Sequence, residues 1–221
     1  MHDLQLVIFD CDGVLVDSET ISNDVLARML SEEGLPTTLS ESRRDYQGML
    51  LSEVFDLAQQ KLGRPLAPDW LARYERVRAE AFQHGLQPVP GAVEAVERVR
   101  AAGVRVCVAS QGKLEKTKLS LDITGMRGLF PERALFSAYG VARGKPHPDL
   151  FLHAAAQMGV PPAGCAVVED TPSGVMAGVS AGMRVFGYAA DSDESALEAA
   201  GAATFSSLEL LPELLALPPR S

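Results

Sequence analysis

The chain has 221 residues, 47% of them hydrophobic, which is enough for one large domain, or for one domain with a sizeable insertion. Its 29 acidic and 20 basic residues give a formal charge of −9, which argues against nucleic acid or an anionic membrane as a partner. An anionic ligand would need local positive charge, either from a few lysine or arginine side chains or from a metal.

The three cysteines, Cys11, Cys107 and Cys165, each lie in or beside an apolar run, which favours buried, reduced thiols over a disulfide framework. No apolar stretch approaches the length of a membrane-spanning helix. The N-terminal sequence MHDLQ also lacks the basic start of a signal peptide. These features predict a cytoplasmic protein that has no membrane partner.

The first predicted strand covers residues 4–9 (LQLVIF), an apolar run that ends in the DCDG sequence of residues 10–13. Side chains alternate along extended backbone, so a strand continuing to Asp12 would put Asp10 and Asp12 on one side. Two neighbouring carboxylates are costly unless a cation lies between them or they share a proton. A simple strand-end turn is the alternative, because Asp and Gly are common turn residues.

Residues 17–87 have helical periodicity and no strand signal. The first helix is expected to start at Asp17-Ser18-Glu19 and to end before Gly34, and further helices are expected at residues 40–46, after an N-cap at Ser52, and at residues 69–82. Trp70 and Tyr74 are interpreted as core residues of this segment. A turn-rich joint, QPVPG, follows at residues 87–91.

Beyond the joint, strands and helices alternate. The expected strands are residues 104–109, 134–137, 165–168, 184–187 and 204–205, and the expected helices are residues 92–102, 113–122, 148–158, 173–181, 194–200 and a C-terminal helix. Strands that are apolar on both faces indicate a parallel sheet covered by helices. The predicted fold is α/β, with a Rossmann-like core of residues 1–16 and 88–221 and an inserted helical domain of residues 17–87.

Polar clusters follow four of the predicted strands, where an open parallel sheet binds its ligands. Besides the aspartates after the first strand, these clusters are SQG at residues 110–112, GKP at residues 144–146 and EDT at residues 169–171. They would place four carboxylates, a hydroxyl and an ammonium group along one edge of the sheet. Each cluster alone is weak evidence, because polar residues often end an apolar run.

Four segments together resemble the signature motifs of the haloacid dehalogenase-like phosphatases. They are FDCDGVLVDSE, VASQG, GKPHPD and VVEDTPSGVMAG, at residues 9–19, 108–112, 144–149 and 167–178. The chain is most similar to the branch with a helical cap after the first strand, which includes sugar-phosphate phosphatases and beta-phosphoglucomutase. This resemblance implies an enzyme that hydrolyses a small phosphorylated sugar or sugar acid, with the cap excluding water and selecting the substrate.

The resemblance implies that Asp10 is the nucleophile that forms an aspartyl-phosphate, and that Asp12 is first general acid and then general base. Lys145, Ser110 and the backbone N–H groups near Gln111 would bind the phosphate. The implied cofactor is Mg²⁺, held by Asp10, the backbone carbonyl of Asp12 and Asp170, with Glu169 binding directly or through water.

Four residues of the inserted segment are further candidates: Glu19 at the cap hinge, Gly48 in the cap, and Arg43 and Arg44 as contacts of a sugar phosphate. A solvated surface is the alternative for the two arginines, and a helix cap is the alternative for Glu19. The expected partner is a small phosphorylated substrate. A monomer is expected, with a dimer as the alternative.

Three other functions are weighed against a phosphatase. Hydrolytic dehalogenases resemble this fold but usually lack the second aspartate, here Asp12. Beta-phosphoglucomutases carry a histidine and an arginine in the cap where this chain has Ser22 and Leu51, which weakens the mutase alternative. A phosphoacceptor signalling module would also combine aspartates with a lysine, but such modules are shorter and have no helical insertion.

Overall fold

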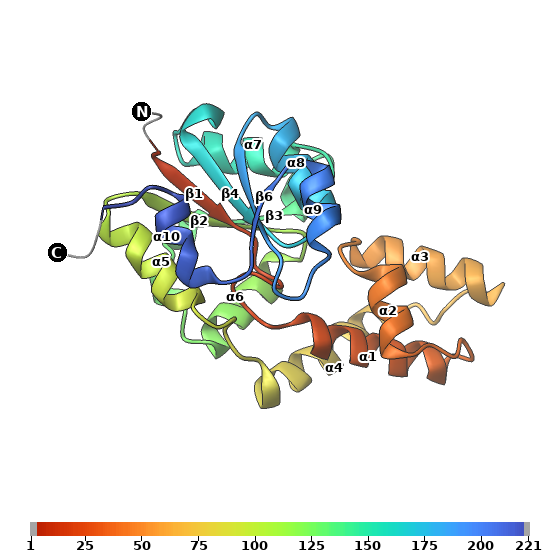
Figure 1. The fold of residues 1–221 in the computed structure, drawn as a ribbon. Coiled ribbons are helices and arrows are strands. Elements are labelled where there is room, and N and C mark those ends of the chain that lie inside the picture. Colours follow the sequence, from red (N-terminus) through yellow and green to blue (C-terminus); the bar gives the residue numbers. More distant parts are fainter. Residues whose placement is uncertain (1–3, 219–221) are drawn as a thin grey trace. The chain divides into compact units, whose positions relative to one another are not determined.

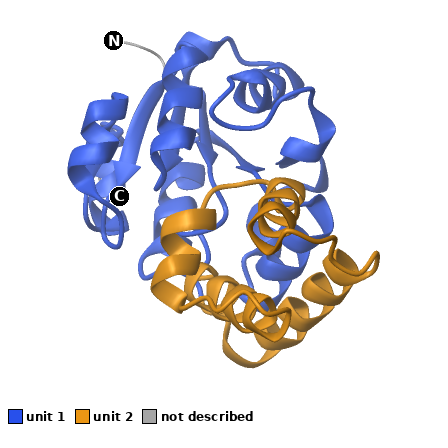
Figure 2. Ribbon diagram, turned by 90° about the vertical axis from the view of Figure 1, so that its right-hand side faces the viewer, with its two compact units in different colours: residues 1–16, 88–221 blue, residues 17–87 orange. Residues whose placement is uncertain are grey.

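The structure is a computed structural model that describes residues 4–218. The chain divides into two compact units, Met1–Val16 with Pro88–Ser221 and Asp17–Gln87 (Figure 2). We call them the sheet unit and the helical unit. Helices in the described residues are all too short or too polar to cross a membrane.

Six parallel strands form the sheet of the sheet unit (Figure 1). They are β1 (Leu6–Phe9), β2 (Arg105–Ser110), β3 (Leu135–Ser137), β4 (Cys165–Glu169), β5 (Arg184–Tyr188) and β6 (Ala203–Phe205), in the spatial order β3-β2-β1-β4-β5-β6. The chain winds outward from β1 to β3 and then crosses back to β4. The topological switch point therefore lies between β1 and β4, where open α/β sheets bind their ligands. The α/β class predicted from the sequence is confirmed.

Helices cover both faces of this sheet, as right-handed crossovers require. On one face lie α5 (Ala92–Ala101), α6 (Leu114–Ile123) and α10 (Leu211–Leu214), and on the other lie α7 (Asp149–Gln157), α8 (Pro172–Ser180) and α9 (Glu194–Ala200) (Figure 1). Short 3₁₀ turns occupy Arg127–Leu129, Glu132–Ala134, Ala138–Gly140, Pro162–Gly164 and Leu208–Leu210. The predicted strands and helices of this unit recur, with small shifts at their ends.

The central strand β1 sets the position of the residues that follow it. All four of its side chains are fully buried, which fits an apolar strand covered on both faces. Phe9 pairs with Val108 of β2 and with Val168 of β4. The backbone N–H of Asp10 donates to the carbonyl of Val168 at 2.9 Å. This register brings Asp10 level with Glu169, the last residue of β4.

The helical unit consists of α1 (Glu19–Glu32), α2 (Leu39–Tyr46), α3 (Leu51–Leu62) and α4 (Trp70–Gly85). Its buried core consists of Val25, Leu26, Met29, Leu30, Tyr46, Val54, Ala58, Leu66, Trp70 and Tyr74. The rings of Trp70 and Tyr74 stack with their centroids 6.0 Å apart. Both residues therefore belong to the core of this unit, as their helical spacing predicted.

The start of α3 differs from the prediction, because Ser52 is not the N-cap. The helix begins two residues earlier than predicted, at Leu51, and Leu50 is its N-cap. The Glu53 carboxylate accepts the backbone N–H of Leu50 at 2.8 Å. This is the half of a capping box that uses the side chain of the third helical residue, so it does not require a hydroxyl at the N-cap.

Truncating the core of the helical unit should lower its stability. Leu30 is fully buried, and Leu30→Ala should lower the free energy of unfolding by about 2–5 kcal/mol because it removes buried methyl groups and leaves a cavity. Trp70 is the single tryptophan of the chain, so its fluorescence during urea unfolding reports on this unit.

Leu152→Ala is the control, because this leucine of α7 is 39% exposed. Its effect should stay within about 0.5 kcal/mol. Equal losses in the two variants would contradict the assignment of Leu30 to a packed core.

Candidate active site

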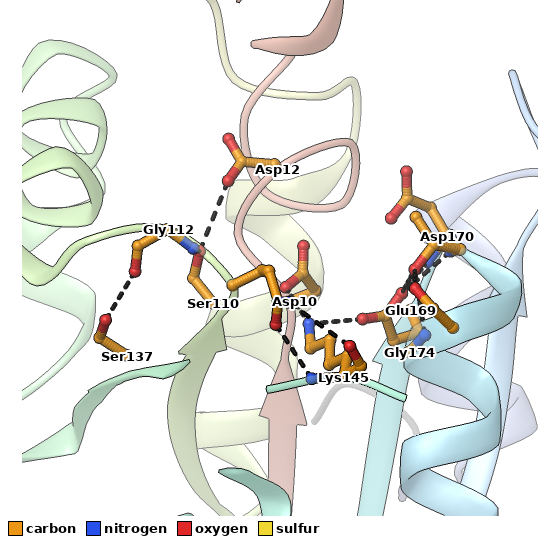
Figure 3. Close-up of polar contacts among 12 residues, drawn as sticks. Asp10, Asp12, Ser110, Gly112, Ser137, Lys145, Glu169, Asp170 and Gly174 are labelled. Carbon is orange, nitrogen blue, oxygen red and sulfur yellow. Dashed lines mark hydrogen bonds and ion pairs between the residues drawn. The ribbon is translucent and has the colours of Figure 1, made fainter. Parts of the chain in front are cut away.

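The site lies where β2, β1 and β4 end side by side (Figure 3). Asp10 follows β1 directly, Ser110 is the last residue of β2, and Glu169 is the last residue of β4. Lys145 comes from the loop before α7. Segments far apart in the sequence therefore bring these four side chains to one edge of the sheet.

Lys145 lies between two carboxylates. Its Nζ is 2.5 Å from Oδ1 of Asp10 and 2.5 Å from Oε1 of Glu169. The Lys145 side chain is 4% exposed, and its ammonium also lies 5.2 Å from the centre of the Phe151 ring. The charge of Lys145 is therefore buried and paired, as a charge away from water must be.

Glu169 is held by several donors at once. Its Oε2 accepts the backbone N–H groups of Asp170 and Thr171 and the hydroxyl of Thr171, each at 2.9 Å. A Cβ at Gly174 would lie 1.9 Å from the Glu169 carboxylate, so α8 can pack here only with a glycine at that position. Both carboxylate oxygens of Glu169 therefore have partners within the protein. This arrangement suits a residue that holds Lys145 in place better than a direct metal ligand, which was one of the two roles expected for Glu169.

Asp12 takes a different direction from Asp10. The sequence predicted that both carboxylates would lie on one side if the strand continued to Asp12. In the structure β1 ends at Phe9, so this condition is not met. The chain instead turns at Gly13, whose φ of 76° favours glycine. The Asp12 carboxylate contacts the Lys116 ammonium and accepts the Ser110 hydroxyl at 3.4 Å. Figure 3 shows this carboxylate pointing away from Lys145.

Lys116 is a site residue that the sequence analysis missed. It lies on α6, and its side chain is 8% exposed. No local sequence signal marked it, because its burial shows only in the structure, where it shares the buried face of α6 with Thr117, Ser120 and Leu121. A lysine on the buried face of a helix predicts a buried partner, since an isolated ammonium is too costly to desolvate.

Gln111 connects two loops of the site. Its side-chain oxygen accepts the backbone N–H of Lys145 at 3.1 Å, and its amide nitrogen lies 3.5 Å from the Lys145 carbonyl. A Cβ at Gly144 would lie 2.8 Å from the Gln111 amide. Gln111 therefore holds the backbone of Lys145 in place, a role that the sequence analysis did not assign to its side chain.

The other four candidates belong to the helical unit. Glu19 opens α1, and its carboxylate accepts the Asn23 amide at 3.1 Å. Arg43 donates to the Thr20 hydroxyl at 2.5 Å, and the exposed Arg44 pairs with Asp45 at 2.7 Å. Gly48 has a φ of 79°, just beyond α2. Contacts of these residues with a substrate remain predictions.

Burial and the nearby charge of Lys145 shift the pKa of Asp10 in opposite directions. Burial is the larger influence and raises the pKa of Asp10 from 3.8 to about 6, although Lys145 lowers it. Burial alone would lower the pKa of Lys145, but the carboxylates of Asp10 and Glu169 raise it overall. The lysine is therefore charged at neutral pH. Four carboxylates and two ammonium groups gather at this edge, which is a formal charge of −2.

The residues present fit a hard divalent cation. A Cβ at Gly13 would lie 2.1 Å from Oδ2 of Asp170, so the backbone after Asp12 lies directly against that carboxylate. Carboxylate and carbonyl oxygens are the ligands that Mg²⁺ prefers, with water and phosphate completing its shell. Within residues 4–218 no group of three or more His, Cys, Asp or Glu side chains is arranged for a metal. The protein would therefore supply two carboxylates and one backbone carbonyl as ligands of the cation.

Several known proteins are similar to this chain in sequence and in fold. A family model described as haloacid dehalogenase-like hydrolase matches residues 4–182. The chain is 34% identical over 215 residues to 6-phosphogluconate phosphatase of Escherichia coli K12, covering 97% of this chain and 96% of the relative. It is 32% identical over 180 residues to hexitol phosphatase B of the same organism, with 80% of each chain covered.

A solved structure is similar over the full length of both chains. It is a HAD family hydrolase from Deinococcus radiodurans R1 with bound phosphate and sodium, 33% identical, with a TM-score of 0.80 and 100% of each chain covered.

The raised pKa of Asp10 predicts that the metal-free protein loses stability against unfolding as the pH rises. A carboxyl with a higher pKa in the folded state binds its proton more tightly there, so its contribution to stability is lost as the pH rises from 3.8 to about 6. Asp10→Asn removes this titration. In EDTA, the unfolding free energy of the variant minus that of the wild type should increase by up to about 3 kcal/mol between about pH 4 and pH 7.

Urea titrations at the two pH values measure this difference. Asp122→Asn is the control, because it removes an exposed carboxyl of α6 in the same unit. A difference for Asp10→Asn that does not change with pH would show that Asp10 titrates normally.

Proposed function

This chain belongs to the haloacid dehalogenase-like hydrolases and is a phosphoric monoester hydrolase, and from this premise we propose a Mg²⁺-dependent phosphatase that works through an aspartyl-phosphate. Relatives named as sugar-phosphate phosphatases support a phosphorylated metabolite as substrate, and we propose a sugar phosphate or sugar-acid phosphate. The observation that carries the mechanism is the buried contact between Lys145 and Asp10 at the tip of the central strand.

Asp10 attacks the phosphorus atom of the substrate. A bond forms between its carboxylate oxygen and phosphorus while the bond from phosphorus to the sugar oxygen breaks. Lys145 holds the Asp10 carboxylate in place and offsets the charge of the incoming phosphate, so attack by an anion on an anion becomes possible. A covalent intermediate of this kind divides one difficult displacement into two easier ones.

Asp12 moves the protons of the two half-reactions. In the first it gives a proton to the leaving sugar oxygen. In the second it takes a proton from the water that attacks the phosphorus of the aspartyl-phosphate, which releases phosphate and restores Asp10. Proton transfer of this kind typically contributes about 10²–10⁴-fold to the rate.

The phosphate oxygens are held by donors at the end of β2 and in the loop before α7. Ser110 supplies its hydroxyl, the backbone near Gln111 supplies N–H groups, and Lys145 supplies its ammonium. Glu169 and Gln111 keep Lys145 in position before the substrate arrives. Preorganised donors of this kind stabilise the charge of the transition state without reorganisation.

Asp10, Asp170 and the backbone carbonyl of Asp12 would hold the Mg²⁺. When bound, the cation would neutralise phosphate charge and balance the formal charge of −2 at this edge. We also propose a cytoplasmic protein. The three cysteines are buried and free, which fits a reducing compartment.

Turnover should require both aspartates and the metal. Release of phosphate from p-nitrophenyl phosphate should occur with Mg²⁺, stop in EDTA and return when Mg²⁺ is added back. Asp10→Asn should abolish turnover because it removes the nucleophile. Asp12→Asn should lower kcat for a sugar phosphate by about 10²–10⁴-fold.

Asp122→Asn, on the exposed side of α6, should keep wild-type turnover. Full activity of Asp10→Asn would rule out the proposed mechanism, whereas activity of the wild type in EDTA would rule out the metal.

A panel of phosphorylated metabolites identifies the substrate and separates phosphatase from mutase. Phosphate release from 6-phosphogluconate or from a hexitol phosphate such as sorbitol 6-phosphate should exceed release from p-nitrophenyl phosphate, as measured by kcat/KM. Incubation with beta-glucose 1-phosphate should give free phosphate and no glucose 6-phosphate. Accumulation of glucose 6-phosphate would instead establish the mutase alternative.

A further inference from the structure

Lys116 reaches the active site from α6 and contacts the carboxylate of Asp12. Its side chain is 8% exposed, and that of Asp12 is 22% exposed. The lysine is therefore the more deeply buried partner of the pair. The roles proposed for Asp10, Asp12, Ser110 and Lys145 do not use Lys116, so the mechanism leaves this charge unexplained.

The loop between β2 and α6 packs closely around Lys116. The Ser110 hydroxyl oxygen accepts the backbone N–H of Gly112 at 3.0 Å, and the Gly112 carbonyl accepts the Ser137 hydroxyl at 2.7 Å. A Cβ at Gly112 would lie 3.4 Å from Cδ of Lys116 and 3.4 Å from the Ser110 hydroxyl oxygen. The lysine stem therefore lies beside this loop, and its ammonium contacts the Asp12 carboxylate.

The direction of Asp12 fits the proton transfer assigned to it. In an in-line phosphoryl transfer, the attacking and leaving oxygens lie on opposite sides of phosphorus. A general acid for the leaving oxygen must therefore point away from the nucleophile. Figure 3 shows the Asp12 carboxylate beside Ser110 and directed away from Asp10 and Lys145. An aspartate side chain has several rotamers, so this direction needs a partner that selects it.

We propose that Lys116 is a positioning residue for Asp12. Its ammonium and the Ser110 hydroxyl together hold the Asp12 carboxylate toward the leaving oxygen, and Lys116 does not itself touch the substrate. This inference rests on the function proposed above and extends it, because it couples the phosphate-binding loop after β2 to the general acid. Direct binding of the substrate phosphate by Lys116 is the alternative that the experiment must separate.

The leaving group of the substrate distinguishes these two roles. A p-nitrophenolate leaves without a proton, whereas a sugar alkoxide requires one. The value of kcat/KM reports on steps up to the first irreversible one, which is phosphoryl transfer to Asp10. A defect in positioning the general acid should therefore lower kcat/KM for a sugar phosphate and spare p-nitrophenyl phosphate. A defect in phosphate binding should lower both values.

Lys116→Met tests the proposal in the full-length enzyme with Mg²⁺. It should lower kcat/KM about 10²-fold for the best sugar phosphate of the panel, because small misplacements of a catalytic group cost about that much. For p-nitrophenyl phosphate the loss should stay below about threefold. Lys118→Met is the matched control: it lies on the same helix, pairs with Glu132 outside the site, and should leave both values unchanged.

A double variant keeps the test valid if Lys116→Met folds poorly. Removing one partner of a buried ion pair is destabilising, but removing both can be neutral, so Lys116→Met combined with Asp12→Asn should fold. If Lys116 acts only through Asp12, the double variant should match Asp12→Asn within about threefold for both substrates. A further fall for both substrates would overturn the proposal and indicate direct contact with the phosphate.

The outcomes also separate this inference from the proposed function. If Asp12→Asn loses sugar-phosphate turnover selectively and Lys116→Met does not, positioning by Lys116 is wrong and the general acid stands. If Asp12→Asn has no selective effect, the role of Asp12 itself is wrong, and the inference fails with it.

Discussion

The site depends on a lysine ammonium enclosed by two carboxylates at the end of a buried sheet. Lys145 contacts Asp10 and Glu169, and all three side chains are at least nine-tenths buried. Charges in such a place are costly to desolvate, and each of these three would be unfavourable without the others. Glu169 is itself held by backbone N–H groups after β4. The group therefore holds the Asp10 carboxylate beside a cation, as the proposed role of Asp10 as nucleophile requires.

Topology explains why these residues meet although they are far apart in the chain. The register of β1 between β2 and β4 places Asp10 at the switch point, level with the last residue of β4. Two glycines then allow close approach without side-chain clashes. Gly13 faces Asp170, and Gly174 faces Glu169.

Much of the fold could be predicted from the sequence, because a buried parallel strand is apolar on both faces and its end is marked by polar residues. The strand before Asp10 and the strand at residues 165–168 were visible in this way, and the motifs that follow them pointed to the family. Directions of side chains beyond the strand ends were not visible. The Asp12 side chain points away from Asp10 because β1 ends at Phe9, so the alternation of a strand no longer sets its direction.

Partners contributed by other elements were the harder part to predict. Lys116 reads as one of several lysines in KLEKTK, and its burial becomes clear only when α6 packs against the site. The prediction for Gln111 concerned the backbone N–H groups near it and gave its side chain no role, whereas that side chain hydrogen-bonds to the backbone of Lys145. The anchoring of Glu169 depends on the fold of the turn after β4. The contacts of Lys116 and Gln111 join segments that are far apart in the sequence, and no local pattern shows that these segments lie close in space.

The central claim is that Asp10 carries the phosphoryl group during turnover. Rapid acid quenching of the enzyme with its best substrate and Mg²⁺, followed by peptide mass spectrometry, tests this claim directly. The account predicts a transient phosphoryl group on the Asp10 carboxylate that appears before phosphate is released. Steady turnover without any phosphorylated Asp10, or with the phosphoryl group on another residue, would contradict it.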